Sequence, residues 1–294
     1  MIVCAVFVFS SCDNRHEPEY TPGFSPTPSR PAMIYILGVH PLHNPKRLYE
    51  IFSPITDFLS QQIPDAVFRV EASRSYAAYD KKLCAGHFHF ALPNPYQTLI
   101  SLKHGYTVFG KMADDENFRG IILVRKDSRI GQVSDLKGKA VSFPAATALA
   151  ATMMPQYYLQ SHGLAVMHDI EIRYVGSQES SIMNVYLGNT AAGATWPPPW
   201  RALVRERPEL EAALEVKWST SSLPNNGLVA RNDMPEALVQ QVGRLLFSLH
   251  THEPGKKWLK RMELSRFEAA DNAVYLPVLE FLQKFNQNVR PIDF

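Results

Sequence analysis

Short apolar runs alternate along the chain with longer segments in which apolar residues recur every three or four positions. The runs at 34–39, 67–70 and 88–92 predict buried strands. The segment after the first run places six apolar residues on one side of a helix: Leu48, Ile51, Phe52, Ile55, Phe58 and Leu59. Further helices are expected over 76–84 and from Pro95 onward. Strands that alternate with helices predict an α/β fold of mostly parallel sheets with right-handed crossovers.

The pattern resumes after a polar loop at 114–119, where we expect the chain to cross from one lobe into another. Strands are predicted at 140–143, 172–175, 191–195 and 227–231, the second of them buried, and helical segments at 147–161, 177–188, 208–214, 235–250, 254–262 and 275–285. The run Trp196 to Trp200, which contains three prolines, reads as a stiffened turn. The segment 217–222 would carry the chain back across. These crossings predict one lobe from 32–118 plus 220–294 and a second lobe from 119–219.

An apolar run at 2–9 precedes Ser10-Ser11-Cys12-Asp13. The run is too short to cross a bilayer as a helix but suits the apolar region of a secretory signal. It resembles a bacterial lipoprotein signal, in which Cys12 is acylated after cleavage, and Asp13 resembles a signal for retention at the inner membrane. An ordinary cleaved signal is the alternative. Residues 13–31 are rich in Pro, Ser, Glu and Thr, which predicts a disordered tether.

Composition narrows the class of protein. The chain has 294 residues, 46% of them hydrophobic and 20% charged, which suits a globular protein with two cores. A net charge of +2 leaves no basic field for a phosphate backbone, so no nucleic acid partner is expected. The three cysteines are too few and too uneven in spacing for a disulfide framework or a zinc cluster. We expect a monomer.

Several motifs in fixed order resemble the phosphate/phosphite/phosphonate substrate-binding family, the solute receptors of ABC importers with the type II periplasmic-binding fold. The motifs are Asp135-Leu136-Lys137-Gly138-Lys139 before a strand, Gly86 before a strand that ends in Asn94-Pro95-Tyr96, Pro155 in a helix, Gly176-Ser177, and Gly188 followed by Ala192-Gly193. The resemblance covers about residues 33 to 285. It implies two lobes, each a mostly parallel sheet flanked by helices, joined by two hinge crossings. It also implies a small ligand and a membrane permease as partners.

Three positions depart from that family's pattern. Ala148-Leu149-Ala150 stands where the family has a Ser-Thr-Ser cradle for phosphate, Gln178 stands where it has a ligand-facing histidine, and Ala191 stands where an acidic residue is frequent. The resemblance therefore carries the fold and the receptor role further than it carries the identity of the ligand.

The candidate binding residues follow from the rule that ligands of open α/β sheets sit beyond the carboxyl ends of the strands. They are His40, Tyr76, Asn94, Tyr96, Thr147, Ser177, Gln178, Trp196 and Trp200. Several begin helices, whose free N–H groups favour an anion, and the aromatic ones could wall the site. Each has an alternative: Ser177 as a helix cap alone, and Tyr96, Trp196 and Trp200 as packed aromatic side chains.

Other kinds of site find little support. His40-x-x-His43 follows the end of one expected strand and His87-x-His89 begins another, so parallel strands would place the two pairs at opposite edges. No metal and no cofactor are therefore expected. The chain lacks a Gly-x-Ser-x-Gly elbow, a phosphate-binding Gly-Lys-Ser/Thr loop and a dinucleotide Gly-x-Gly-x-x-Gly motif, so an enzyme is not expected.

Together with these residues, the resemblance implies an extracytoplasmic, lipid-anchored receptor that closes on a small oxyanion or phosphonate-like ligand and serves an ABC importer. We expect it in the periplasm, with the inner membrane favoured over the outer. A ligand-sensing subunit of a membrane signalling or redox system with the same fold is the alternative, and a hydrolase is a third hypothesis.

Overall fold

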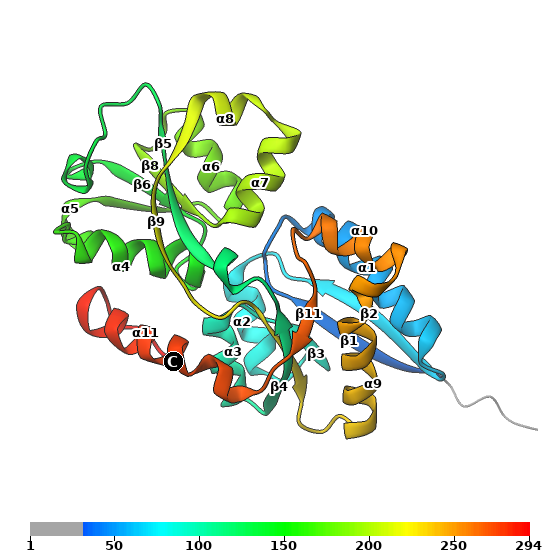
Figure 1. Cartoon of the computed structure of the whole chain (residues 1–294). Coiled ribbons are helices and arrows are strands. Elements are labelled where there is room, and N and C mark those ends of the chain that lie inside the picture. Colours follow the sequence, from blue (N-terminus) through cyan, green and yellow to red (C-terminus); the bar gives the residue numbers. More distant parts are fainter. Residues whose placement is uncertain (1–31) are drawn as a thin grey trace, which may run out of the picture. The chain divides into compact units, whose positions relative to one another are not determined.

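The computed structural model describes residues 32–294. Two β-sheets, each flanked by helices, make up this part of the chain (Figure 1). The predicted signal with Cys12 and the predicted tether at 13–31 lie outside the described residues. Within 32–294, no helix has both the length and the apolar character that a membrane span requires.

The first sheet has six strands in the order β11-β4-β10-β3-β1-β2. Its strands are β1 (Met33–Val39), β2 (Ala66–Ala72), β3 (Phe90–Leu92), β4 (Tyr106–Met112), β10 (Gly227–Arg231) and β11 (Phe267–Ala269). Strand β1 pairs in parallel with β2 and β3, whereas β10 runs antiparallel between β3 and β4. The helices that follow its strands are α1 (Pro45–Gln62), α2 (Tyr76–Cys84), α3 (Pro95–Leu102), α9 (Glu236–Phe247), α10 (Glu253–Arg261) and α11 (Leu276–Asn288).

The second sheet has five strands in the order β7-β6-β8-β5-β9. Its strands are β5 (Arg119–Arg125), β6 (Ala140–Phe143), β7 (Glu171–Tyr174), β8 (Ala192–Thr195) and β9 (Leu214–Ser222). Its helices are the π-helical turn η3 (Leu149–Met153), α4 (Met154–Ser161), α5 (Val166–Asp169), α6 (Gln178–Tyr186), α7 (Pro197–Glu206) and α8 (Glu209–Ala213). Four 3₁₀ turns complete the described elements: η1 (Asp115–Asn117), η2 (Val133–Leu136), η4 (Leu249–Thr251) and η5 (Asn272–Tyr275).

The α/β architecture and most of the predicted elements are confirmed, with three differences. Both sheets are mixed, because the strands next to the two crossings, β5 and β10, run antiparallel to their neighbours. Strand β7 lies at an edge of its sheet, so Glu171, Arg173 and Tyr174 are exposed and the prediction of a buried strand was wrong. The proline run begins helix α7 in place of a turn, since proline fits the first helical positions.

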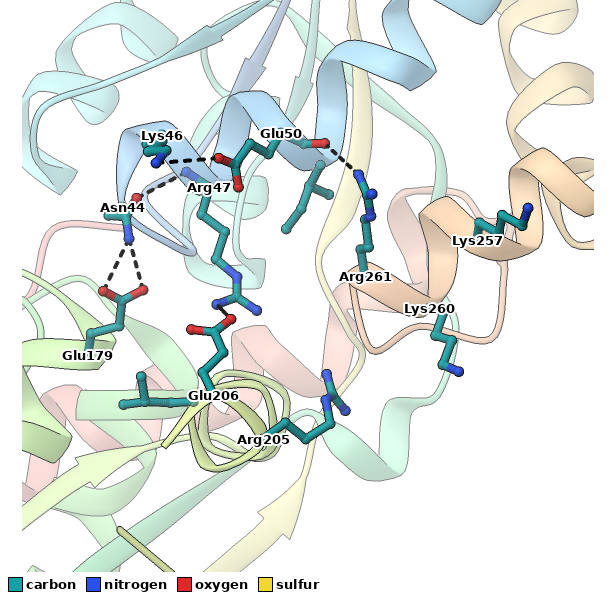
Figure 2. Close-up of a pocket in the computed structure, with 12 residues that line it drawn as sticks. Asn44, Lys46, Arg47, Glu50, Glu179, Arg205, Glu206, Lys257, Lys260 and Arg261 are labelled. Atoms are coloured by element: carbon teal, nitrogen blue, oxygen red, sulfur yellow. Dashed lines mark hydrogen bonds and ion pairs between the residues drawn. The ribbon is translucent and has the colours of Figure 1, made fainter. Parts of the chain in front are cut away.

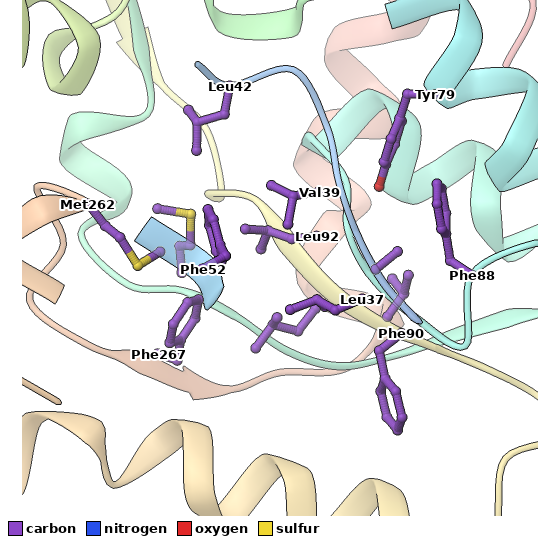
Figure 3. Close-up of a cluster of buried hydrophobic side chains, with 14 of the residues drawn as sticks. Leu37, Val39, Leu42, Phe52, Tyr79, Phe88, Phe90, Leu92, Met262 and Phe267 are labelled. Atoms are coloured by element: carbon purple, nitrogen blue, oxygen red, sulfur yellow. The ribbon is translucent and has the colours of Figure 1, made fainter. Parts of the chain in front are cut away.

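The core under the first sheet fixes the edge at which β1 and β3 end. Figure 3 shows Val39 of β1 and Leu92 of β3 side by side, and both are fully buried. A Cβ on Gly38 would lie 2.4 Å from the ring of Phe88, so only glycine allows β1 to pack this closely on that ring. The ends of β1 and β3 are therefore held together, which fixes the starting points of the loops that carry His40 and Asn94.

Two segments join the sheets. The chain leaves β4 through η1 and enters β5, and it returns from β9 into β10. Strands β5 and β9 pair over most of their length and run beside each other between the sheets (Figure 1). The crossings expected from the sequence near 119 and 220 fall at the start of β5 and near the end of β9.

Candidate functional site

Residues from both sheets meet around a small cavity, which we call the central cavity. Its volume is about 10 Å³, which is room for about one water molecule. The lining residues are His40, Tyr76, Asn94, Phe118, Ala148, Leu149, Ala150, Ala151, Gln178, Trp196 and Asn226. Five of the nine side chains predicted from the sequence are among them: His40, Tyr76, Asn94, Gln178 and Trp196.

His40 follows the last residue of β1 and is almost completely buried. Its Nδ1 lies 2.8 Å from the carbonyl oxygen of Leu92. Because a carbonyl oxygen only accepts hydrogen bonds, Nδ1 carries the ring proton and Nε2 keeps a free lone pair. Burial lowers the pKa of His40 to about 4, so the ring is neutral at physiological pH. The site therefore gains an acceptor here and no positive charge.

Gln178 is the first residue of α6 and links the two sheets through its amide. Thr195 Oγ1 donates a hydrogen bond of 2.9 Å to Gln178 Oε1. This contact directs Gln178 Nε2 toward the hydroxyl of Tyr76, 3.5 Å away at the start of α2. Burial raises the pKa of the Tyr76 phenol, which stays protonated. Both side chains thus offer neutral polar groups.

Asn94 and Thr147 form a second link between the sheets. Asn94 caps α3, with its Oδ1 accepting from the backbone N–H of Gln97, and its Nδ2 donates 3.0 Å to the carbonyl oxygen of Thr147. The hydroxyl of Thr147 donates 3.2 Å to Asp80, which also accepts from the Gln97 amide. Burial raises the pKa of Asp80. Thr147 is therefore held by two groups of the first sheet's helices, next to the central cavity.

The start of η3 presents unpaired backbone donors. The π-helical turn runs directly into α4, so Leu149–Ser161 is continuous helix. Thr152 N–H bonds to the Ala148 carbonyl at 2.8 Å, whereas the amides of Leu149, Ala150 and Ala151 precede the first closed turn and have no partner among the described residues. They line the central cavity at the positive end of the helix. The hydroxyl cradle is absent, but the backbone donors remain.

Gly120 of β5 brings this helix start close to the sheet. A Cβ there would lie 2.6 Å from the carbonyl oxygen of Ala150 and 2.6 Å from Pro155 Cδ. Any larger residue would push the helix start away from β5. Gly120 therefore sets the position of the three free amides.

The opposite wall is aromatic. Trp196, buried between β8 and α7, meets the ring of Phe118 edge-on, with centroids 5.5 Å apart. Phe118 directly precedes β5. Aromatic rings here exclude water and leave space for an apolar part of a ligand.

Sequence reasoning missed Phe118 and Asn226. The rule applied to the sequence considers the carboxyl ends of parallel strands, but β5 and β10 run antiparallel and so bring their amino ends to the same edge. Asn226 precedes β10 and is fully buried. The signal that could have found both residues is the pair of crossings, which must bring reversed strands into each sheet.

Three predicted residues lie away from the central cavity. The Tyr96 hydroxyl donates to the carbonyl oxygen of Asp293 and borders a separate pocket of about 340 Å³. Ser177 caps α6 by accepting from Ser180 N–H at 3.0 Å. Trp200 packs, half-buried, against the apolar cluster around Ile182. Ser177 thus acts as a helix cap, and Tyr96 and Trp200 are packed aromatic side chains. These three residues are therefore not part of the proposed site.

A wider groove of about 890 Å³ lies where helices of the two sheets meet. Figure 2 shows Asn44 at the start of α1 pointing toward Glu179 of α6, with Asn44 Nδ2 3.1 Å from the carboxylate. Arg47 reaches Glu206 of α7 at 2.6 Å. Lys257, Lys260 and Arg261 of α10 form the far wall. Since Glu179 directly follows Gln178 in the chain, these cross-sheet contacts adjoin the central cavity.

Metal binding finds no support in the part of the chain that the structure describes. Within 32–294, no three His, Cys, Asp or Glu side chains gather where they could hold a metal ion. His89 Nδ1 accepts from the backbone N–H of Ile36 in the middle of β1, whereas His40 lies beyond the end of that strand.

Known proteins share this fold and part of this sequence. A probable ABC transporter phosphite-binding protein of Prochlorococcus marinus is 23% identical over 186 residues, an alignment that spans 59% of this chain and 63% of that protein. The structure of PhnD1 from Prochlorococcus marinus in complex with methylphosphonate superposes with a TM-score of 0.80 at 20% identity, covering 88% of this chain and 100% of that one. A binding protein component of an ABC phosphonate transporter from Pseudomonas aeruginosa gives a TM-score of 0.79 at 17% identity, covering 87% of each chain.

The periplasmic aliphatic sulphonate binding protein of Escherichia coli has the fold as well, with a TM-score of 0.62 at 15% identity over 89% of this chain and 88% of that one. At these identities the likeness establishes the fold. The family model described as "ABC transporter, phosphonate, periplasmic substrate-binding protein" matches residues 37–275. The chain therefore belongs to the family of periplasmic substrate-binding proteins of phosphonate ABC transporters.

Proposed function

We propose that this protein is the solute receptor of an ABC importer and that it closes on a small phosphonate-type oxyanion at the central cavity. The observation that carries the proposal is the meeting of three free backbone amides of η3 with polar side chains from the first sheet's loops. Oxyanions accept several hydrogen bonds at once, and a helix start supplies donors together with about half a positive charge. The apolar wall made by Phe118 and Trp196 suits a ligand with a small carbon substituent.

Closure would follow from contacts that each lobe makes with the same ligand. The cavity holds about one water molecule, so the walls must lie farther apart than in this structure both for a ligand to enter and for the lobes to enclose it. We assign the lobes to 32–118 plus 220–294 and to 119–219, with the crossings next to β5 and β9 as hinges. A ligand that touches both lobes stabilises the closed form by its differential affinity for that form. The closed form would then be the one that a membrane permease receives.

We also propose that the receptor works outside the cytoplasm, held at the inner membrane through acylated Cys12 and the tether at 13–31. Support comes from the apolar run before Cys12 and from Asp13 after it. Mass spectrometry of the mature N-terminal peptide tests this proposal. We expect a diacylglyceryl mass on Cys12, and an unmodified cysteine in a membrane-free protein would contradict it.

Isothermal titration with methylphosphonate tests the ligand site. Gln178→Ala removes a side chain that lines the cavity, whereas Ser177→Ala removes its immediate neighbour, which lies outside. We expect Gln178→Ala to weaken binding by about tenfold or more, the effect of one well-placed buried hydrogen bond. Ser177→Ala loses a helix cap, and thermal unfolding measures that loss of stability and shows that the variant is folded at the titration temperature. Its affinity for methylphosphonate should then lie within about twofold of the wild type. Equal affinities for both variants would contradict the site.

A further inference from the structure

The central cavity contains hydrogen-bond acceptors as well as donors. We propose that the ligand is a singly charged oxyacid that keeps one protonated oxygen, and that this O–H donates to Nε2 of His40. The inference rests on the proposed function and specifies its ligand class: a monoprotonated phosphonate or phosphite, and not a sulfonate or a fully ionised dianion.

The tautomer of His40 determines which ring nitrogen can accept a hydrogen bond from a ligand. Leu92 O lies 2.8 Å from Nδ1 and accepts its proton, so Nε2 must be the acceptor of the ring. Nε2 makes no hydrogen bond among the described residues, and it is not one of the fully enclosed unpaired atoms although the whole residue is only 3% exposed, so it is open to the cavity that His40 lines. Once a ligand fills the cavity and excludes water, an acceptor left unpaired there is costly, whereas a ligand that donates to it removes this cost. A ligand with acceptors alone would leave the cost in place.

The groups that face His40 cannot change this arrangement near neutral pH. Tyr76 and Tyr79 of α2 meet its ring edge-on, with centroids 6.2 and 6.3 Å away, and burial raises the pKa of both phenols. His43, on the same loop, has its pKa lowered to about 3 by burial and by Arg47. With the pKa of His40 itself lowered to about 4, the ring stays a neutral acceptor at physiological pH.

Asn226 supplies a second, independent acceptor. Its amide is fully buried in the cavity wall, with Nδ2 placed 3.2 Å from the sulfur of Met112 and Oδ1 without a partner among the described residues. Two unpaired acceptors therefore accompany the three unpaired N–H groups of η3. A ligand that satisfies this set needs several acceptor oxygens and at least one donor.

The charges of the residues that line the central cavity also favour a singly charged ligand. None of the eleven side chains that line the cavity is Lys, Arg, Asp or Glu. Asp80, a carboxylate outside the lining, accepts a hydrogen bond from the hydroxyl of Thr147. One negative charge can be balanced by a helix start, but a second charge in a water-excluded cavity has no cation to pair with. A monoanion is thus favoured over a dianion.

The experiment compares three small probes by isothermal titration: methylphosphonate, its O-methyl monoester and methanesulfonate. Both the monoester and the sulfonate are monoanions without an acidic O–H; methanesulfonate matches methylphosphonate in size, whereas the monoester is larger by one methyl group. We expect methylphosphonate to bind at least about tenfold more tightly than either at about pH 6, and to weaken as the pH rises through its second ionisation toward about pH 9.

Two variants assign this preference to His40. His40→Phe keeps an aromatic ring against Tyr76 and Tyr79 but has no acceptor, so the preference for methylphosphonate over methanesulfonate should fall to within about twofold. His40→Gln restores an acceptor and should recover part of the preference. Thermal unfolding of both variants confirms that each is folded before titration.

The outcomes separate the two proposals. If all three probes bind equally well in the wild type, or if methylphosphonate affinity is independent of pH, the inference about the ligand's proton is overturned while the proposed receptor function stands. If none of the three binds, the proposed function is wrong for this class of oxyanion, and the inference is overturned with it.

Discussion

Thr195 Oγ1 donates a 2.9 Å hydrogen bond to Oε1 of Gln178, and this bond decides which end of the Gln178 amide faces the central cavity. Thr195 is the last residue of β8, and Gln178 is the first of α6, so the contact connects a strand end of the second sheet to a helix start. With its oxygen engaged, the amide directs its N–H₂ group toward Tyr76. A residue buried behind the cavity therefore sets the donor that the ligand would meet.

Replacing Thr195 by valine should weaken ligand binding without removing any side chain that lines the cavity. Valine keeps the shape but loses the hydroxyl, which leaves Gln178 Oε1 unpaired and free to rotate. We expect a loss of about 1–2 kcal/mol in the free energy of unfolding and about a tenfold loss in affinity for methylphosphonate. Thr195→Ser, which retains the hydroxyl, is the control for titration and urea unfolding. Wild-type affinity in the valine variant would contradict the orienting role.

Gly120→Ala should impair binding more than its size suggests. The added Cβ would lie 2.6 Å from Ala150 O and from Pro155 Cδ, so the start of η3 must move away from β5. Overpacking of this kind costs about 1–3 kcal/mol in the free energy of unfolding. The displaced amides would no longer reach a bound oxyanion, so affinity would fall. Gly131→Ala is the control, because its nearest atom, Asp135 Oδ2, lies 3.7 Å from the added Cβ. The NMR chemical shifts of the amides of residues 149–151 and titration with methylphosphonate read out the effect; equal behaviour of the two variants would contradict it.

Much of the fold could be predicted from the sequence because strong local signals coincide with tertiary packing. The bounds of α2, β6 and β10 match the prediction residue for residue, and Asn94 caps α3 as its position before a proline indicated. The direction of β5 and β10 was not predictable in the same way, since an apolar run does not reveal which way a strand enters a sheet. The alternation of strand and helix suggested parallel pairing where the crossings impose antiparallel pairing.

The candidate site was predictable to the extent that strand ends determine it. His40, Asn94 and Trp196 lie directly beyond β1, β3 and β8, and the structure brings them to one cavity. Ser177 lies one residue from Gln178 but caps its own helix, and the sequence alone does not decide between a helix cap and a ligand contact. The donors of η3 are backbone N–H groups, so no side-chain motif in the sequence predicts them.

Stability should fall as the pH drops from about 6.5, because His40 and His43 are buried in their neutral forms. Their folded-state pKa values are about 4 and about 3, below the ordinary value of 6.5. Between these values the unfolded chain binds protons that the folded protein does not, so the free energy of unfolding decreases by about 1.4 kcal/mol per pH unit for each histidine.

In His40→Gln, the unfolded chain has one histidine fewer to protonate, so the stability of this variant depends less on pH. Between pH 7 and pH 5, we expect this variant to lose about 2 kcal/mol less than the wild type, measured by urea unfolding at the two pH values. The carboxylates of the wild type and the variant contribute equally to the pH dependence of stability, so their contribution cancels when the two losses are compared. An identical loss in both would mean that His40 is protonated in the folded state.

The contacts across the wide groove should contribute modestly to closure, and salt should weaken them. Arg47 pairs with Glu206 at 2.6 Å, but the Glu206 side chain is 56% exposed, so water and ions screen the attraction. A double-mutant cycle of Arg47→Ala and Glu206→Ala should give a coupling of about 0.2–1 kcal/mol in ligand binding, which decreases at high salt. Lys46 and Glu50 make a pair within α1 alone and serve as the control cycle, since separating the lobes leaves that pair intact. A coupling in the Lys46–Glu50 cycle as large as in the first would mean that the Arg47–Glu206 pair does not report on closure, because both pairs would then affect binding by a route other than lobe contact.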